Sequence, residues 1–185
     1  MVFKGIKKVH GGEFISRYDL EYETKSGGKK VYEMISRDPN VDSLESLQKK
    51  DIDAVVMIVR DPCGGKLLLN REFRPAVGEW VYNFPAGLIN EGETPEEAAA
   101  RELFEETGLT LLSIDEVWAP SYSAVGFSNE RNIVMVCTAD GTIGESNSEV
   151  EEIEARWLTA GEVRELLKTE VFAARTQAYC MKWAF

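Results

Sequence analysis

The segment from Thr94 to Gly108 constrains the fold most, because it specifies a helix together with both of its ends. Thr94 suits an N-cap, Pro95 suits the first helical position, and Glu97 stands where it can bond back to the cap. Gly108 is a natural C-terminal stop. Apolar positions that would hold this helix against a sheet are Ala98, Ala99, Leu103 and Phe104. The sequence therefore predicts an amphipathic helix packed on other elements.

Strand-forming segments lie on both sides of this helix. Residues 54–59 form a short apolar run, a turn follows at 61–65, and further strands are expected at 66–73, 80–84, 110–119, 132–138 and 152–158. The intervening segments 85–93, 120–131 and 139–150 have the character of loops. Thr159 and Glu162 can begin another helix, and the tail from 162 to about 182 is mostly helix-forming. This order indicates an α/β sandwich with a mixed sheet packed between helices.

The N-terminal part has a different pattern. Residues 14–24 and 29–37 alternate between polar and apolar, and Ser26-Gly27-Gly28 separates them, which predicts a β-hairpin. The polar residues 38–51 break that pattern. We therefore expect a small N-terminal β unit at 1–50, followed by the main domain at 51–185.

Composition excludes several classes of protein. The chain has 21 Lys and Arg against 32 Asp and Glu, a net charge of −11, which repels a polyanionic backbone and makes nucleic acid an unexpected partner. Cys63, Cys137 and Cys180 contain no CxxC pair, so a reducing cytoplasm is expected. No stretch approaches the ~18 apolar residues of a membrane span. Because His10 is the only histidine, Ser-His and Cys-His pairs and multi-histidine metal sites are excluded, and carboxylates become the candidates.

Three such carboxylates, Glu102, Glu105 and Glu106, fall on or beside one face of the expected helix. Like charges at this spacing destabilise an isolated helix, and a solvated acidic face is the simplest interpretation of a glutamate pair. Here, apolar residues also hold the helix against a sheet. A hard divalent cation, Mg²⁺ or Mn²⁺, explains the repulsion best, and it could clamp the oxygens of a diphosphate.

The loop at 87–93 precedes the helix, and its glycines permit close approach of the backbone. Glu93 is available to brace Arg101 at the edge of the site. Structural roles are favoured over catalytic ones for Gly87, Gly92, Glu93 and Arg101.

A longer pattern runs from Gly87 to Leu109. It consists of Gly87, five residues, Glu93, seven residues and then Arg101-Glu102-Leu103-Phe104-Glu105-Glu106-Thr107-Gly108-Leu109. This pattern resembles the Nudix box at every specified position. The resemblance implies the Nudix α/β/α fold and hydrolysis of a nucleoside diphosphate linked to another group. It implies metal binding by Glu102, Glu105 and Glu106, with Ala86 as a further ligand. Gly87, Glu93 and Gly108 would frame the box, and Arg101 and Glu105 join the candidate catalytic set.

More of the chain resembles the ADP-ribose (ADP-sugar) pyrophosphatase branch of that family. Segments 71–75 and 84–89 are similar to the stretch before the box in that branch, and 30–37 is similar to its N-terminal strand. The resemblance implies that Tyr32 stacks on the base and that Arg37 and Arg74 contact the substrate. It also implies a homodimer in which the N-terminal unit serves the partner's site.

The acidic run at 148–154 resembles the segment of that branch that supplies a general base and another metal contact. Matching it residue by residue suggests Glu149 as the base and Glu151 as a ligand or alternate base. A solvated acidic run is the alternative, and the register leaves Glu149, Glu151 and Glu152 interchangeable.

The sequence departs from the branch at Val125, where many ADP-ribose enzymes have the proline of a Ser-Pro-Gly turn. The expected function is Mg²⁺-dependent cleavage of ADP-ribose to AMP and ribose 5-phosphate. Two alternatives remain open, namely a hydrolase of another nucleotide sugar (GDP-mannose or UDP-glucose type) and a non-catalytic ADP-ribose sensor.

Overall fold

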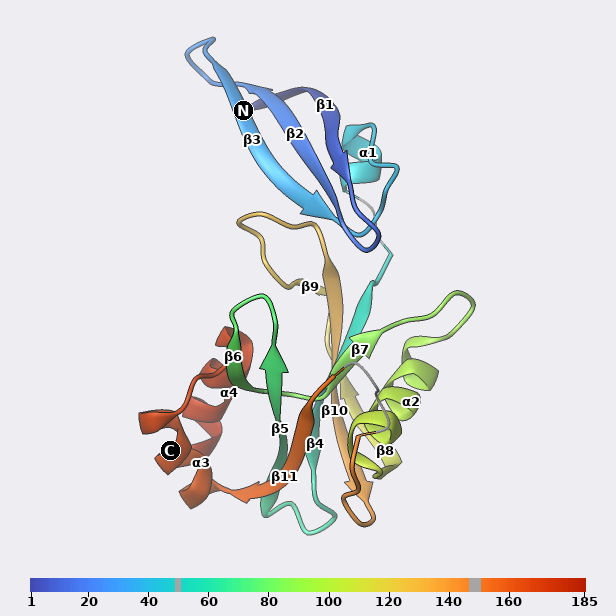
Figure 1. Ribbon diagram of the computed structural model, residues 1–185, viewed down its shortest axis with the longest axis vertical. Coiled ribbons are helices and arrows are strands. Elements are labelled where there is room, and N and C mark those ends of the chain that lie inside the picture. Colours follow the sequence, from blue (N-terminus) through green and yellow to red (C-terminus); the bar gives the residue numbers. More distant parts are fainter. Residues whose placement is uncertain (49–50, 147–150) are drawn as a thin grey trace. The chain divides into compact units, whose positions relative to one another are not determined.

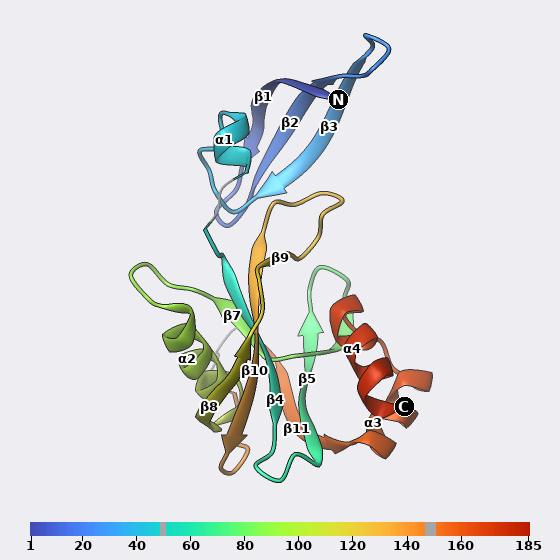
Figure 2. The same cartoon turned by 180° about the vertical axis from the view of Figure 1, so that it is seen from behind.

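The computed structural model describes residues 1–48, 51–146 and 151–185. The chain forms two compact units, one made of Met1–Asp53 and Pro120–Asn132 and the other of Ala54–Ala119 and Ile133–Phe185. Figure 1 and Figure 2 show the two units from opposite sides. Segment 120–132, of which the sequence predicts 120–131 as a loop, therefore belongs to the same unit as the N-terminal residues.

The first unit contains an antiparallel sheet in the order β1-β2-β3. Its elements are β1 (Val2–Gly11), β2 (Ser16–Glu23), β3 (Lys29–Ser36), the single-turn helix α1 (Leu44–Leu47) and β9 (Ser121–Tyr122). The expected hairpin is confirmed, since β2 and β3 pair without a register shift from Ser16↔Ser36 to Glu23↔Lys29. A small core of Tyr18, Leu20, Met34 and Val41 closes one face of the sheet.

The second unit is built on a mixed sheet in the order β11-β5-β4-β10-β8, with β6 paired to β5 and β7 paired to β4. The strands are β4 (Ala54–Arg60), β5 (Lys66–Arg74), β6 (Glu79–Asn83), β7 (Ala86–Leu88), β8 (Thr110–Val117), β10 (Arg131–Asp140, whose first two residues are counted with the first unit) and β11 (Ile153–Thr159). The helices are α2 (Pro95–Thr107), α3 (Ala160–Thr169) and α4 (Ala174–Ala184).

Strand β4 shows how the layers form. Its odd-numbered residues Val55, Met57 and Val59 pack with α2, while Val56 and Ile58 pack on the opposite face with residues of α3 and α4. A strand that is apolar on both faces must be covered on both sides. Helix α2 lies on one side of the sheet and α3 and α4 on the other (Figure 1). The predicted Nudix-type α/β sandwich is confirmed.

The structure contains elements that the sequence did not predict, including α1 in the segment 38–51 and β9 in the expected loop 120–131. Residues 2–11 form β1, a strand with no clear alternation, which exists through its pairing with β2. The loop before the helix contains β7, which pairs with Ala54–Val56 of β4. The helix-forming tail is split into α3 and α4. No helix among the described residues is long and apolar enough to cross a membrane.

Candidate active site

Helix α2 begins and ends as its local chemistry predicts. Thr94 accepts a hydrogen bond from the backbone N–H of Glu97 at 3.2 Å, and the Glu97 carboxylate accepts one from the backbone N–H of Thr94 at 2.8 Å. Gly108 ends the helix in the left-handed conformation with φ 74°. Because these caps fix where the helix begins and ends, they also fix where the clustered glutamates lie along it.

Gly87, on β7, lies directly beneath the side chain of Glu102. A Cβ added to Gly87 would be 1.8 Å from Glu102 Cδ, far inside any real contact distance. Because β7 is hydrogen-bonded to β4 through Val55↔Gly87, the backbone there cannot easily move away. The glycine is therefore required by the position of the Glu102 carboxylate, and its φ lies outside the left-handed region.

Arg101 is the centre of an ion-pair network on the exposed side of α2. Its guanidinium makes two 2.8 Å bonds to the Glu93 carboxylate, which holds it in a forked geometry. It also donates to Glu102 at 2.8 Å, to Glu105 at 3.1 Å and to the backbone carbonyl of Leu88 at 2.9 Å. The predicted brace between Glu93 and Arg101 is thus present in the structure.

The network shifts the pKa of Glu93. Hydrogen bonds from Arg101 and from the backbone N–H of Asn90 lower the pKa of Glu93 to about 2. The hydrogen bonds to Glu93, and also those to Glu102 and Glu105, raise the pKa of Arg101, so Glu93 and Arg101 are both ionised at neutral pH. Arg101 therefore ties the loop at 87–93 to the helix that carries the glutamates.

Glu106 faces the interior and is 6% exposed. Its carboxylate accepts a 2.8 Å hydrogen bond from the side-chain amide of Asn70, a residue of β5 that is 1% exposed. Burial raises the pKa of Glu106 well above its ordinary value, and the negative charges of Glu102 and Glu72 raise it further. A buried carboxylate with like charges nearby is stabilised by a cation.

Glu102 and Glu151 belong to the same electrostatic cluster. Burial raises the pKa of Glu102, Arg101 opposes this, and the charges of Glu105 and Glu151 add to the increase. The charge of Glu151 also raises the pKa of Glu106. The structure thus brings Glu151 into the electrostatic neighbourhood of the helix glutamates, while Glu149 lies outside the described residues.

Two buried polar residues of β5, one of which contacts this site, were not singled out from the sequence. Asn70 contacts Glu106, and Glu72, which is 8% exposed, accepts a 2.9 Å bond from the side-chain amide of Asn83. Both stand in a strand that was correctly predicted. A polar residue directly after the buried run Leu67–Leu69 is the signal that could have identified Asn70.

The donor set fits a hard divalent cation. Carboxylate oxygens are the preferred ligands of such ions, and Glu106 with its raised pKa needs a positive partner. Asn70 Oδ1 is buried and has no hydrogen-bond partner among the described residues, so it can accept from a hydrated ion. In the described ranges, no group of three or more acidic, His or Cys side chains is placed, in the observed conformation, to hold a metal ion. Several ligands supplied by retained waters are typical of Mg²⁺.

The residues expected to bind substrate lie in different units. Arg74, in the second unit, has a half-exposed side chain 3.4 Å from the Glu72 carboxylate. In the first unit, Arg37 donates to Glu130 at 2.6 Å, and the Tyr32 hydroxyl donates to the backbone carbonyl of Gly126. Both first-unit residues therefore contact the segment 120–132.

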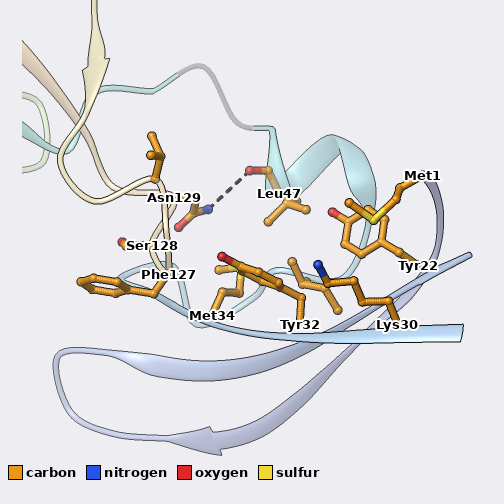
Figure 3. Close-up of a pocket in the computed structure, with 11 residues that line it drawn as sticks. Met1, Tyr22, Lys30, Tyr32, Met34, Leu47, Phe127, Ser128 and Asn129 are labelled. Atoms are coloured by element: carbon orange, nitrogen blue, oxygen red, sulfur yellow. Dashed lines mark hydrogen bonds between the residues drawn. The ribbon is translucent and has the colours of Figure 1, made fainter. Parts of the chain in front are cut away.

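Tyr32 also lines a pocket of about 290 Å³ in the first unit. Figure 3 shows the Tyr32 ring beside Met34 and Lys30, with Phe127 and Asn129 contributed by the 120–132 segment. Lys30 Nζ lies 5.5 Å from the centre of the Tyr32 ring. The pocket is lined by Met1, Leu20, Tyr22, Lys30, Tyr32, Met34, Leu47, Val125, Phe127, Ser128 and Asn129. Val125, where the sequence departs from the branch pattern, is part of this lining.

A family profile described as the NUDIX domain matches residues 50–179, more than half of the chain. The chain belongs to the Nudix family. Helix α2 is accordingly the Nudix helix, and the chain is a Nudix pyrophosphohydrolase.

Known proteins resemble the chain over different lengths. An ADP-ribose pyrophosphatase of Bacillus subtilis (strain 168) is 28% identical over 182 residues, which cover 96% of this chain and 88% of the relative. An ADP-sugar pyrophosphatase of Mus musculus is 33% identical over 106 residues, 54% of this chain and 44% of the relative. A crystal structure of an ADP compounds hydrolase has a TM-score of 0.67 at 18% identity and covers 98% of this chain and 93% of that one, which is a likeness of fold.

Proposed function

We propose that this Nudix enzyme hydrolyses ADP-ribose to AMP and ribose 5-phosphate with Mg²⁺ as its cofactor. The observation that carries the proposal is the buried, hydrogen-bonded carboxylate of Glu106 beside Glu102. The negative charge of Glu151 raises the pKa of both carboxyl groups. The B. subtilis ADP-ribose pyrophosphatase, which is similar over nearly the whole chain, supports this choice of substrate class.

The protein's own residues have distinct tasks in this proposal. Glu102, Glu105, Glu106 and Glu151, with the backbone carbonyl of Ala86, would hold the cation. When bound, the cation would neutralise charge on the diphosphate oxygens and acidify a coordinated water. Arg101, which donates to the Glu93 carboxylate and to the backbone carbonyl of Leu88, holds the loop at 87–93 against the Nudix helix. It acts by positioning the carboxylates.

The bond-breaking step needs a proton acceptor, for which we propose Glu149. Water attacks one phosphorus, its proton passes to the Glu149 carboxylate, and the bond from that phosphorus to the bridging oxygen breaks. The leaving phosphate keeps the electron pair, so no covalent intermediate is needed. Glu151 and Glu152 are the alternative bases, because they stand in the same acidic run.

For the nucleoside, we propose that the Tyr32 pocket binds the base. The pocket combines a flat aromatic face, a neighbouring cation at Lys30 and polar side chains at Ser128 and Asn129. Arg37 and Arg74 are proposed to contact phosphate or ribose, because a guanidinium can donate two parallel hydrogen bonds. A homodimer, implied by the family resemblance, remains a prediction that sedimentation analysis of the purified protein can test.

The deciding experiment is a hydrolysis panel compared by kcat/KM with Mg²⁺ and with Mn²⁺. It includes ADP-ribose, ADP-glucose, GDP-mannose, UDP-glucose, NADH, diadenosine polyphosphates and dNTPs. An ADP-sugar should lead by at least ~10-fold, about 1.4 kcal/mol of differential transition-state binding. A leading GDP- or UDP-sugar would refute the adenine preference and keep the mechanism. Tight ADP-ribose binding without cleavage of any compound would instead indicate a sensor.

A further inference from the structure

Asn70 is a polar residue at a position where the fold by itself favours an apolar one. It follows Leu67, Leu68 and Leu69, all fully buried, and is itself 1% exposed. Its Oδ1 has no hydrogen-bond partner in the described part of the chain, which is unfavourable for a buried amide. The amide of Asn70 therefore adds little to the stability of the fold. The reason for an asparagine at this position must lie in the contact that its Nδ2 makes.

That contact is Glu106. Asn70 Nδ2 donates to Glu106 Oε2 at 2.8 Å, and both residues are buried. The hydrogen bond fixes one carboxylate oxygen and leaves Oε1 outside this contact. A carboxylate held through one oxygen presents the other in a defined direction, which is what a ligand to a small, geometrically strict cation requires.

The strand carrying Asn70 is well placed to hold a side chain still. In β5, Asn70 is paired with Ala155 of β11 on one side and with Asn83 of β6 on the other. Its backbone is thus held by strands on both edges, and its Cβ direction is set by the sheet. Helix α2, by contrast, presents Glu106 on a longer side chain with three rotatable bonds. The rigid partner therefore orients the flexible one.

We propose that Asn70 is a positioning residue that orients Glu106 for cation binding. This inference rests on the proposed function, because it assigns Glu106 to the metal site. Removal of the Asn70 amide should weaken cation binding about 10- to 100-fold, the usual effect of losing a partner that orients a metal ligand. The overall fold should persist, because the change removes one side-chain hydrogen bond among the described residues and keeps the backbone pairing of β5 with β6 and β11.

The chain offers a matched control in the neighbouring pair of Asn83 and Glu72. Asn83 Nδ2 donates to Glu72 at 2.9 Å, so it is also a buried amide bound to a buried carboxylate. Asn83 Oδ1 additionally accepts from Thr176 at 2.8 Å and from the backbone N–H of Phe84 at 3.0 Å. Asn83→Leu therefore breaks more hydrogen bonds than Asn70→Leu, and any general loss of stability should be larger in the control.

The test is a Mn²⁺ titration of the metal-free, full-length protein without substrate, following the paramagnetic resonance signal of free Mn²⁺. Wild type, Asn70→Leu, Asn70→Ala and Asn83→Leu are compared, and circular dichroism checks their folding. We expect Mn²⁺ to bind the Asn70 variants about 10- to 100-fold more weakly, and Asn83→Leu to stay within about 3-fold of wild type. Turnover by the Asn70 variants should recover at saturating Mn²⁺, which a purely structural defect would not allow.

Wild-type affinity in either folded Asn70 variant would overturn the proposal, as would an equal loss in Asn83→Leu. Failure of both Asn70 variants to fold would assign Asn70 to stability and reject the positioning role. If wild type itself binds no Mn²⁺, the metal site of the proposed function fails as well. A wild type that binds Mn²⁺ with unchanged Asn70 variants rejects the role of Asn70 alone.

Discussion

The carboxylate of Glu102 occupies the space that a side chain at Gly87 would need, with Glu102 Cδ 1.8 Å from the position of the missing Cβ. Because the clash involves the end of a flexible side chain, Gly87→Ala should move Glu102 and leave the sheet intact. The substitution thus tests whether a displaced Glu102 side chain lowers activity while the protein remains folded.

We therefore expect Gly87→Ala to lower kcat/KM by about 100-fold, since a misplacement of ~1 Å at a reacting centre has that effect. The melting temperature should stay close to that of wild type. Gly65→Ala is the matched control, because a Cβ at Gly65 would meet nothing within 4 Å. Steady-state kinetics and thermal melts measure both properties, and normal activity in Gly87→Ala would mean that the observed position of Glu102 is not needed for turnover.

Removal of the charge of Glu106 should affect activity and stability in opposite directions. Glu106→Gln keeps the size of the side chain but removes a buried negative charge near Glu102, so the metal-free protein should be stabilised. Turnover should nearly vanish because a metal ligand is lost. Glu105→Gln is likewise expected to remove turnover.

The control for these variants is Glu96→Gln, the same change at an exposed position in the first turn of α2. Its activity should match that of wild type. Diphosphate hydrolysis with Mg²⁺ and circular dichroism are the measurements, and full activity in both Glu105→Gln and Glu106→Gln would refute the proposed metal site.

Glu93 should control how stability responds to acid. Its pKa is lowered to about 2 from an ordinary value of 4.5, so its ionised form stabilises the folded protein at pH values above about 4.5. That contribution is lost as the pH falls from 4.5 towards 2. Glu93→Gln should therefore be less stable than wild type at pH 6, and the difference should shrink through this window. Thermal melts from pH 2 to pH 7 measure it, with Glu91→Gln in the same loop as control; a constant difference would contradict the assignment.

Glu149 is predicted to be the general base. Glu149→Gln should then lower kcat by ~10²–10⁴ with little change in the substrate Kd. Rapid-quench kinetics and equilibrium binding would separate these quantities. The same loss in Glu151→Gln or Glu152→Gln, with normal turnover in Glu149→Gln, would move the base to that residue.

Tyr32 has two separable groups, a ring that lines the pocket and a hydroxyl that bonds to Gly126. If the ring stacks on the base, Tyr32→Leu should raise KM for ADP-ribose about 10-fold with little change in kcat. Tyr32→Phe keeps the ring and should stay within about 3-fold of wild type. An equal effect in the two variants would place the importance of Tyr32 in the hydroxyl contact with the 120–132 segment.

Local sequence determined the features whose causes lie within a few residues. Thr94, Glu97 and Gly108 specify both ends of α2, because capping hydrogen bonds join residues close along the chain. The alternation around Ser26-Gly27-Gly28 specifies the β2–β3 hairpin for the same reason. The spacing from Gly87 to Glu106 likewise carries the Nudix resemblance, since one loop and one helix contain the whole motif.

Other features arose only in the tertiary structure. Strand β1 exists because β2 offers it hydrogen-bonding partners, and its own sequence shows no alternation. Asn70 reaches Glu106 across 36 positions, and Arg37 reaches Glu130 across 93. No local pattern encodes such pairs, because the distance between them depends on how strands and helices pack. The sequence thus indicated which carboxylates are candidates for the site, and packing decided which residues contact them.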